Sequence, residues 1–287
     1  MPFPENLDLK AIITAALQED HAFNDITTKS LGLGIFFTDA QIVAKEKGVL
    51  AGITIAFEVF KEVDPKVNCK ALKNDGETFK EKDVLAVLKG RAASILTAER
   101  TALNLLTRLS GIATLTNAFV EKAANDKVKI VDTRKTTPGI RVLEKYAVRM
   151  GGGFNHRNDL EEAVLIKDNH IAAMRKKEAG ITLAAIVERT RSKVKDMLIG
   201  IEVNTVKEFK EVIVAKPDII MLDNMDIFVM RECVRLRNRF DKNIQLEISG
   251  NVHILNVAEL AKIGAERISI GALTHSPKAI DMSLQII

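Results

Sequence analysis

The sequence predicts a mixed α/β protein, with an N-terminal α/β sandwich built on an antiparallel sheet and a C-terminal β/α barrel. Short apolar or alternating runs, broken by glycines and turn residues, fill residues 35–90, as in an antiparallel sheet. From residue 128 onward, apolar runs alternate with helix-length segments, as in a parallel sheet with crossover helices. Neither GxGxxG after the first of these runs nor a P-loop motif occurs, which favours a barrel over an open nucleotide-binding sheet.

The N-terminal part begins with a predicted helix over residues 5–20, where apolar residues recur at helical spacing. Asp25-Ile26-Thr27-Thr28 follows as a turn or a strand entry. Asn74-Asp75-Gly76 is a sequence that favours a tight turn. One helix is expected at residues 53–63, and strands are expected at 35–37, 41–43, 48–50, 67–72 and 84–88.

The longest helical segment spans residues 92–124, and its apolar residues cover much of the helix circumference. Such a helix is expected to be buried on more than one side. Gly111 within it indicates either a break or a close crossing with another segment. Arg100 stands in the same run, and from the helix alone an ion pair with Glu99 or a helix neighbour is the favoured interpretation.

The C-terminal part contains six expected strands, with a seventh possible nearby. Helix-length segments separate most of them, which implies right-handed crossovers and a parallel sheet. The strands are expected at residues 128–131, 164–167, 198–203, 219–222, 245–248 and 267–270, and the helices at 140–147, 181–191, 206–215, 228–240 and 253–263.

Bulk composition argues against several classes of function. The formal net charge is only +4, which disfavours general nucleic-acid binding by a basic surface. Cys69 and Cys233 form neither a disulfide framework nor a paired metal motif, as expected in a reducing cytoplasm. The first ten residues do not have the pattern of a signal peptide, and no run reaches the ~18 apolar residues of a membrane span. We therefore expect a cytoplasmic protein without a nucleic-acid or membrane partner.

Residues 132–170 carry the densest group of cations, which begins after one β-branched run and ends after another. Gly139 and the triplet Gly151-Gly152-Gly153 interrupt it, and glycine lets backbone approach a ligand closely. Cations beside apolar strands are costly to desolvate unless an anion meets them. The segment therefore predicts a deep site for a small, multiply charged anion. The cations are Arg134, Lys135, Arg141, Lys145, Arg149, His156, Arg157 and Lys167.

Each expected strand of the barrel ends in a polar or glycine cluster. In a barrel these ends converge on one face, where active sites of this architecture lie. Backbone N–H groups after the last strands often bind phosphate there. The clusters are Asp132-Thr133-Arg134-Lys135, Lys167-Asp168-Asn169, Glu202-Val203-Asn204, Asp223-Asn224, Ser249-Gly250-Asn251 and Ile270-Gly271-Ala272.

Two carboxylates, Glu202 and Asp223, belong to the same ring of strand ends. Beside a phosphate they would be repulsive unless a hard cation such as Mg²⁺ lay between them. The alternative for the empty protein is that they pair with Lys135 and Lys167. The expected ligands are a polycarboxylate and a phosphorylated molecule with a metal.

Several motifs resemble, in order and spacing, those of the quinolinate phosphoribosyltransferases (decarboxylating nicotinate-nucleotide pyrophosphorylases), a type II phosphoribosyltransferase family. The matching segments are DITT, ERTALNLLTRLSGIAT, DTRKTTPGIRVLEKYAVRMGGGFNHR, LIKDNH, IEVNT, LDNM, LEISGN and RISIGALTHS. The resemblance covers nearly the whole chain, and DTRKTTPG with GGGxNHR is specific. It implies an α/β sandwich over residues 1–112, completed by the tail 273–287, and an open, incomplete β/α barrel over 113–272.

The resemblance also implies an activity and an assembly. Phosphoribosyl would pass from phosphoribosyl pyrophosphate to quinolinate with decarboxylation, giving nicotinate mononucleotide, pyrophosphate and CO₂ for NAD biosynthesis. The assembly would be a homodimer or a higher homo-oligomer in which Arg100 reaches a neighbouring subunit's site. This implied role replaces the ion-pair interpretation of Arg100.

Residue roles follow from the same resemblance. Arg100, Arg134, His156, Arg157 and Lys167 would hold the two carboxylates of quinolinate. Phosphoribosyl pyrophosphate would be bound by Lys135, Glu202, Asp223, Ser249, Gly250, Asn251 and Gly271, with Thr133, Ile270 and Ala272 also among the substrate-binding residues. Glu202 and Asp223 would bind Mg²⁺, directly or through water. Lys135, Lys167, Glu202 and Asp223 are the predicted catalytic residues.

Two positions depart from the family pattern, which often has glycine where this chain has Phe23-Asn24 and Asp159. Neither supplies a proposed ligand, so the departures concern loop geometry. Three alternatives remain open: a phosphoribosyltransferase acting on another small heterocyclic acid, a barrel lyase forming a Schiff base on Lys167 or Lys135, and a non-catalytic sensor of an anionic metabolite.

Overall fold

The computed structural model describes residues 9–287, so residues 5–8 of the predicted first helix lie outside the described part. The chain forms two compact units. The first comprises Met1–Asn117, Lys135–Gly153 and Ala272–Ile287, and the second comprises Ala118–Arg134 and Phe154–Gly271. The sequence predicted one domain over residues 1–112 and 273–287 and a second over 113–272, and this division stays a prediction. The compact units differ from it in that residues 135–153 belong to the first unit.

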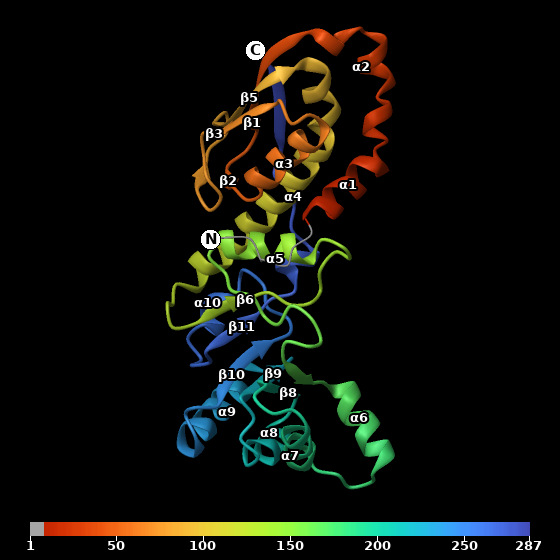
Figure 1. Ribbon diagram of the computed structural model, residues 1–287. Helices are drawn as coiled ribbons and strands as arrows, with labels where there is room; N and C mark the ends of the chain where they lie inside the picture. The colour runs from red at the N-terminus through yellow and green to blue at the C-terminus, as the bar shows by residue number, and fades with distance from the viewer. Residues whose placement is uncertain (1–8) are drawn as a thin grey trace. The chain divides into compact units, whose positions relative to one another are not determined.

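An antiparallel sheet of order β12-β1-β5-β3 forms the first unit's main layer (Figure 1). The run predicted at 41–43 lies in β1, which pairs with β5 from Phe37 to Val43 apart from one bulge after Ile42. The strand predicted at 35–37 was largely wrong: Ile35 ends the 3-10 helix η2, and β1 begins at Phe37. The C-terminal strand β12 pairs with β1, placing Met282 opposite Ala44. The strands are β1 Phe37–Ala44, β3 Asn68–Ala71, β5 Val84–Arg91 and β12 Met282–Ile286, with β2 Gly48–Val49 and β4 Thr78–Phe79 forming a separate pair.

Helices pack against this sheet and share a buried apolar core with it. The predicted helix at 53–63 is confirmed at those bounds as α3. The prediction of a turn or strand entry at 25–28 was wrong: the Asp25 carboxylate accepts a hydrogen bond from the backbone N–H of Thr28 (3.0 Å) and caps a short helix. The elements are α1 Leu9–Glu19, η1 Ala22–Asn24, α2 Ile26–Ser30, η2 Leu33–Ile35, α3 Ile53–Val63, α4 Ala92–Ala123, α5 Arg141–Met150 and α11 Ala272–His275.

The long helix α4 confirms the helix predicted at 92–124. It is buried on several sides, as its fully buried residues Ile95, Leu106 and Ile112 show. Gly111 does not break it. A Cβ at Gly111 would stand 2.2 Å from the carbonyl oxygen of Lys278. Gly111 therefore marks a close approach between α4 and the chain just before β12.

Gly111→Ala is expected to destabilise the protein by about 1–3 kcal/mol, because the added methyl overlaps backbone that cannot swing aside. Helix propensity alone would give the opposite sign, since alanine is favoured over glycine by about 1 kcal/mol in a helix. Chemical denaturation gives the free energy of unfolding. Gly34→Ala is the control, since nothing lies within 4 Å of its added Cβ. A Gly111→Ala protein more stable than the parent would refute the close approach.

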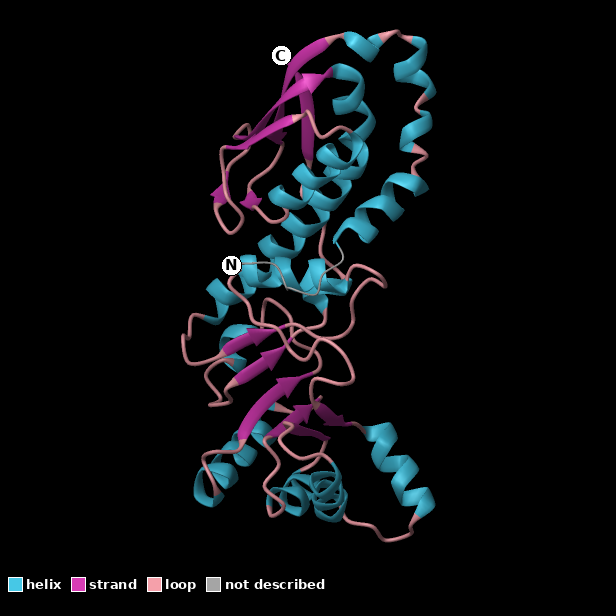
Figure 2. Cartoon of the chain, in the orientation of Figure 1, coloured by secondary structure: helices cyan, strands magenta, loops and turns pink. Residues whose placement is uncertain are grey.

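A six-stranded sheet of order β6-β11-β10-β9-β8-β7 forms the second unit, and every pairing is parallel (Figure 2). The edge strands β6 and β7 are not paired with each other, so the barrel is open, as the resemblance implied. The possible seventh strand appears only as a single parallel bridge between Val131 and Phe154. The strands are β6 Lys129–Val131, β7 Val164–Ile166, β8 Ile199–Val203, β9 Ile219–Asp223, β10 Gln245–Ser249 and β11 Arg267–Ser269.

The predicted helices of this unit recur with two differences. Residues 168–177 form a helix, α6, that the sequence analysis did not include, and it starts directly after Lys167. The helix predicted at 253–263 is only four residues long, because the Asn256 side chain bonds the backbone N–H of His253 (2.9 Å) and the carbonyl of Asn251 (2.9 Å) in a local turn. The helices are α6 Asp168–Lys177, α7 Leu183–Lys193, α8 Val206–Ile213, α9 Ile227–Phe240 and α10 Val257–Leu260.

Candidate functional site

The carboxyl ends of the six parallel strands meet at one edge of the sheet, and most predicted site residues lie there. Pairing places Asp223 of β9 opposite Ser249 of β10, and Glu202 of β8 opposite Met221 of β9. The backbone N–H of Ile270 donates to the carbonyl of Val131 (2.9 Å), which joins the ends of β11 and β6. This edge therefore brings together Thr133, Arg134, Lys167, Glu202, Asp223, Ser249, Gly250, Asn251, Ile270 and Gly271.

Lys167 and Glu202 form an ion pair, with Nζ 3.2 Å from Oε1, so part of the predicted alternative pairing is present. Burial raises the pKa of Glu202, and the charge of Lys167 opposes that rise. The nearby carboxylates of Asp223 and Asp168 raise the pKa of Glu202 further. The three acids thus lie close enough to interact electrostatically, and a cation beside Glu202 and Asp223 would relieve part of this repulsion.

Arg157 is almost wholly buried, with 9% of its surface exposed. Its Nη1 donates a hydrogen bond to the carbonyl of Ala163 (2.7 Å). Burial lowers the pKa of Arg157, the charge of Arg134 lowers it further, and Glu202 and Asp159 act in the opposite direction. A guanidinium that is desolvated beside a second guanidinium is stabilised by an anion, so these two side chains suit a carboxylate ligand.

The loop carrying His156 and Arg157 is held by a buried acid. Asp132 is fully buried, and its carboxylate accepts from the backbone N–H of His156 (2.8 Å) and the side-chain amide of Asn155 (2.6 Å). The Nδ1 atom of His156 in turn accepts from the backbone N–H of Arg157 (2.8 Å). Asp132 thus ties this loop to the end of β6.

The loops after β9 and β10 are packed against each other. Asn224 N–H donates to the carbonyl of Ser249 (2.9 Å), and the Asn224 side chain lies where a Cβ on Gly250 would have to be, 2.1 Å from Oδ1. Gly250 also has a φ of +84°, which disfavours other residues. Only glycine therefore fits beside Asn224 at the predicted phosphate end.

Three predicted residues, Arg100, Lys135 and Ala272, belong to the first unit, and their roles stay predictions. Arg100 is exposed on α4, where its charge lowers the pKa of Glu99 against the stronger effect of burial. The carbonyl of Lys135 accepts a hydrogen bond from the hydroxyl of Thr274 (2.7 Å). Of the two departures, Phe23-Asn24 lies in η1, and Asp159 closes a turn by accepting from the N–H groups of Glu161 (2.8 Å) and Glu162 (3.0 Å).

Two residues of the strand bodies were missed by the sequence analysis. Glu247 of β10 and Arg267 of β11 are paired neighbours in the sheet, with Oε2 2.9 Å from Nε. Glu247 has no exposed surface. The available signal was an acid between Leu246 and Ile248 in an apolar run, because a charge inside a buried strand needs a partner.

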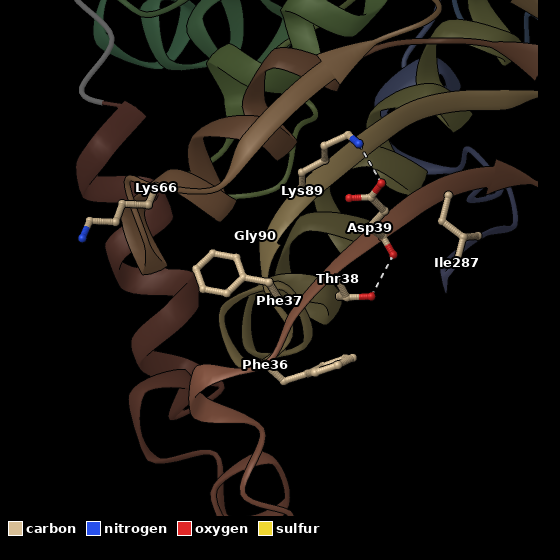
Figure 3. Close-up of a pocket in the computed structure, with 8 residues that line it drawn as sticks. All are labelled: Phe36, Phe37, Thr38, Asp39, Lys66, Lys89, Gly90 and Ile287. Carbon is tan, nitrogen blue, oxygen red and sulfur yellow. Dashed lines mark hydrogen bonds and ion pairs between the residues drawn. The ribbon is translucent and has the colours of Figure 1, made fainter.

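A surface hollow of about 590 Å³ lies on the sheet of the first unit (Figure 3). It contains an ion pair between Lys89 and Asp39, with Nζ 2.7 Å from Oδ2. Its lining residues are Phe36, Phe37, Thr38, Asp39, Lys66, Lys89, Gly90 and Ile287. None of the predicted site residues is among them, so this hollow is separate from the candidate site.

Within residues 9–287, no three His, Cys, Asp or Glu side chains are grouped so as to hold a metal by themselves. Glu202 and Asp223 provide two carboxylates, and Mg²⁺ is usually held by one or two carboxylates together with ligand oxygens. The donor set therefore fits Mg²⁺ shared with a phosphorylated ligand. None of the helices in the described part of the chain is long and apolar enough to span a membrane.

The fold and this edge define an α/β protein with a cationic site, bordered by acids, for a small polyanion. Family models for the quinolinate phosphoribosyl transferase N-terminal domain and C-terminal domain match residues 25–110 and 112–285. The chain therefore belongs to the quinolinate phosphoribosyltransferase family.

Curated relatives and solved structures agree with this membership. A probable nicotinate-nucleotide pyrophosphorylase (carboxylating) of Synechocystis is 41% identical, covering 94% of this chain and 90% of the relative. One of Bacillus subtilis with the same description is 40% identical, covering 98% and 94%. The crystal structure of NadC from Streptococcus pyogenes superposes with a TM-score of 0.91 at 35% identity and covers all of both chains.

Proposed function

We propose that this chain is a quinolinate phosphoribosyltransferase that converts quinolinate and phosphoribosyl pyrophosphate to nicotinate mononucleotide, pyrophosphate and CO₂, a step of NAD biosynthesis. The observation that carries the proposal is one sheet edge with a buried arginine, Arg157, beside Arg134, and an acidic pair. Arg134 and Arg157 suit the carboxylates of a diacid, and Glu202 and Asp223 suit a metal-bound phosphate.

In the proposed reaction, Arg134, His156, Arg157 and Lys167 form the quinolinate pocket, together with Arg100 of a neighbouring subunit. Glu202 and Asp223 would hold Mg²⁺, which when bound offsets the negative charge of the pyrophosphate. Lys135 adds positive charge at the same leaving group. Much of the acceleration comes from holding two mutually repelling anions in reacting positions.

The bonds change in two stages. The bond from the ribose carbon C1 to the pyrophosphate oxygen breaks, and the pyridine nitrogen gives its electron pair to form the new C1–N bond. The ring nitrogen then carries positive charge, so the adjacent carboxylate leaves as CO₂ and its bonding electrons pass to the ring. The vacated ring carbon finally takes up a proton.

The direct test is release of pyrophosphate from phosphoribosyl pyrophosphate with Mg²⁺, with and without quinolinate, together with CO₂ release from carboxyl-labelled quinolinate. Both products are expected in equal amounts, and their absence with a folded protein would refute the proposal. Another heterocyclic acid that releases pyrophosphate faster than quinolinate would favour the related transferase. Borohydride trapping of a carbonyl substrate on Lys167 or Lys135 would favour the lyase.

Asp223→Asn is expected to raise the Mg²⁺ concentration that gives half-maximal rate by roughly tenfold, about 1.4 kcal/mol, because one anionic ligand is lost. Initial rates measured over a Mg²⁺ titration give this value. Asp126→Asn makes the same chemical change at an exposed position of the same unit and should leave the requirement unchanged. An unaltered requirement in the Asp223→Asn protein would remove Asp223 from the metal site.

We also propose a homo-oligomer with shared sites, in which Arg100 acts in its neighbour's pocket. Mixing an Arg100→Ala subunit with a Lys167→Ala subunit is then expected to restore part of the activity that each variant lacks. In a dimer, one of the two sites would regain both side chains. Failure to recover activity after mass spectrometry has established mixed oligomers would contradict sharing. A cytoplasmic location stays a prediction, which cell fractionation tests.

A further inference from the structure

A row of paired residues crosses one face of the parallel sheet. Strand pairing places Glu202 opposite Met221, Met221 opposite Glu247, and Glu247 opposite Arg267. Side chains at paired positions project to the same face of a sheet. Glu247 is therefore on the face of Glu202, although the sequence places it in the body of a strand instead of at its end.

Glu247 is fully buried and has two basic neighbours. Its Oε2 lies 2.9 Å from Nε of Arg267, and its Oε1 lies 3.5 Å from Nε2 of His156. Burial raises the pKa of Glu247, Arg267 opposes the rise, and Glu202 adds to it. His156, Arg157 and Arg267 also line a partly open cavity of about 150 Å³. A buried carboxylate destabilises the folded protein unless its oxygens interact with positive charges or hydrogen-bond donors.

The hydrogen bonds of His156 determine where its ring carries hydrogen. The backbone N–H of Arg157 donates to Nδ1 (2.8 Å), so Nδ1 must offer a lone pair. A neutral imidazole with an acceptor at Nδ1 has its proton at Nε2, and Nε2 is the atom that faces Glu247. The same bond cannot be made by an imidazolium, in which both nitrogens are donors.

We propose that Glu247 is a positioning residue: it holds His156 as the neutral Nε2–H tautomer, and His156 holds the Arg157 backbone so that its guanidinium meets the substrate. His156 then contributes orientation, and the positive charge of the pocket comes from the arginines and lysines. The inference rests on the proposed function only in naming quinolinate as the ligand of Arg157.

Charged groups lie near His156 on the sheet, at the end of β6 and in its own loop. Glu247 and Arg267 face it from the sheet, Asp132 holds its backbone N–H, and Arg157 follows it in the chain. Glu247 lies beside Nε2 of the ring, and Nδ1 accepts from the Arg157 amide, which cannot change its protonation. Geometry, rather than the balance of charge, keeps the ring neutral.

The first test reads the tautomer by NMR of the protein with ¹⁵N-labelled histidine at neutral pH. The chain contains five histidines, and His156→Asn identifies the signal by its disappearance. The expected spectrum has one protonated and one unprotonated ring nitrogen, with the proton on Nε2. Two protonated nitrogens, or a proton on Nδ1, would overturn the inference. This readout needs no catalytic activity, so a protein that fails to use quinolinate defeats the proposed function without deciding the tautomer.

The second test separates orientation from charge. The Oδ1 atom of asparagine can replace Nδ1 as the acceptor for the Arg157 amide. The KM for quinolinate is therefore expected to be at least about fivefold lower in the His156→Asn protein than in the His156→Ala protein. The reason is that an unmade hydrogen bond costs about 1–3 kcal/mol. If the imidazole instead supplied positive charge, both neutral replacements would raise KM equally, which would overturn the inference.

Glu247→Gln completes the test. It is expected to raise the KM for quinolinate roughly tenfold while kcat and the KM for phosphoribosyl pyrophosphate change less than about threefold, because one oriented acceptor is lost. The control is Glu266→Gln, which makes the same change in an acid paired with Arg237. Equal changes in all three constants, or an unchanged KM for quinolinate, would overturn the role of Glu247.

Discussion

Replacing Arg157 by alanine is expected to weaken quinolinate binding by roughly 2–5 kcal/mol, the range for truncating one partner of a buried, hydrogen-bonded charge pair. Arg157 has only 9% of its surface exposed, and burial already lowers the pKa of its guanidinium, so binding adds little to the cost of removing water from it. In the Arg157→Ala protein, a substrate carboxylate would be buried without the guanidinium as its partner. Isothermal titration with quinolinate measures the affinity.

Arg189→Ala is the matched control, because Arg189 belongs to the same unit and pairs with Glu178 at the surface, Nη2 2.9 Å from Oε2. Exposed pairs contribute about 0.2–1 kcal/mol to stability, and this one touches no predicted site residue. Unchanged affinity in the folded Arg157→Ala protein would take Arg157 out of the binding site and leave the desolvated guanidinium without a function.

Glu144→Ala is expected to lower the free energy of unfolding by about 3–5 kcal/mol, as for removal of one member of a buried ion pair. Glu144 is fully buried in α5. Its Oε1 accepts from Nη2 (2.8 Å) and Nε (3.1 Å) of Arg108 and from the hydroxyl of Thr137 (2.8 Å), and its Oε2 accepts from the N–H of Thr137 (3.0 Å). The substitution would leave the half-buried guanidinium of Arg108 without its carboxylate.

Denaturant titration of the parent and the variant measures this difference. Glu58→Ala is the control, since Glu58 is also helical but forms an exposed pair with Lys61, worth about 0.2–1 kcal/mol. A loss below 1 kcal/mol for Glu144→Ala would show that the network is not needed for stability. Thr137 lies two residues after Lys135, so the network also fixes the segment that carries a predicted catalytic lysine.

Local sequence patterns were sufficient for most elements. Residues 53–63 have helical apolar spacing, and α3 has those bounds because its buried face follows the same repeat. The strands of the second unit were found from apolar runs, since strands covered on both sides need few polar residues. The strand-end clusters were found for a related reason: polar residues return where the buried run stops.

Sequence patterns gave the wrong secondary structure where a single side chain changed the local backbone conformation. Asp25 converts a β-branched segment into a capped helix, and Asn256 shortens α10 by bonding its own turn. The helix α6 was missed because LIKDNH was interpreted as a strand end, whereas a new helix begins at Asp168. Capping and side-chain turns involve single residues, so they leave no periodic signal.

The sequence by itself determined the two kinds of sheet, the glycine-rich cationic segment and the acids at the strand ends, because burial and charge follow residue type. Only the tertiary structure decided that Gly111 is a close approach, that Arg267 stands beside Glu247, and that His156 turns Nε2 toward that acid. Each of these contacts joins strands or loops that are distant in sequence. The sequence of one strand does not specify which strand will pair with it. Register and loop contact, which sequence spacing does not encode, set the geometry around Arg157.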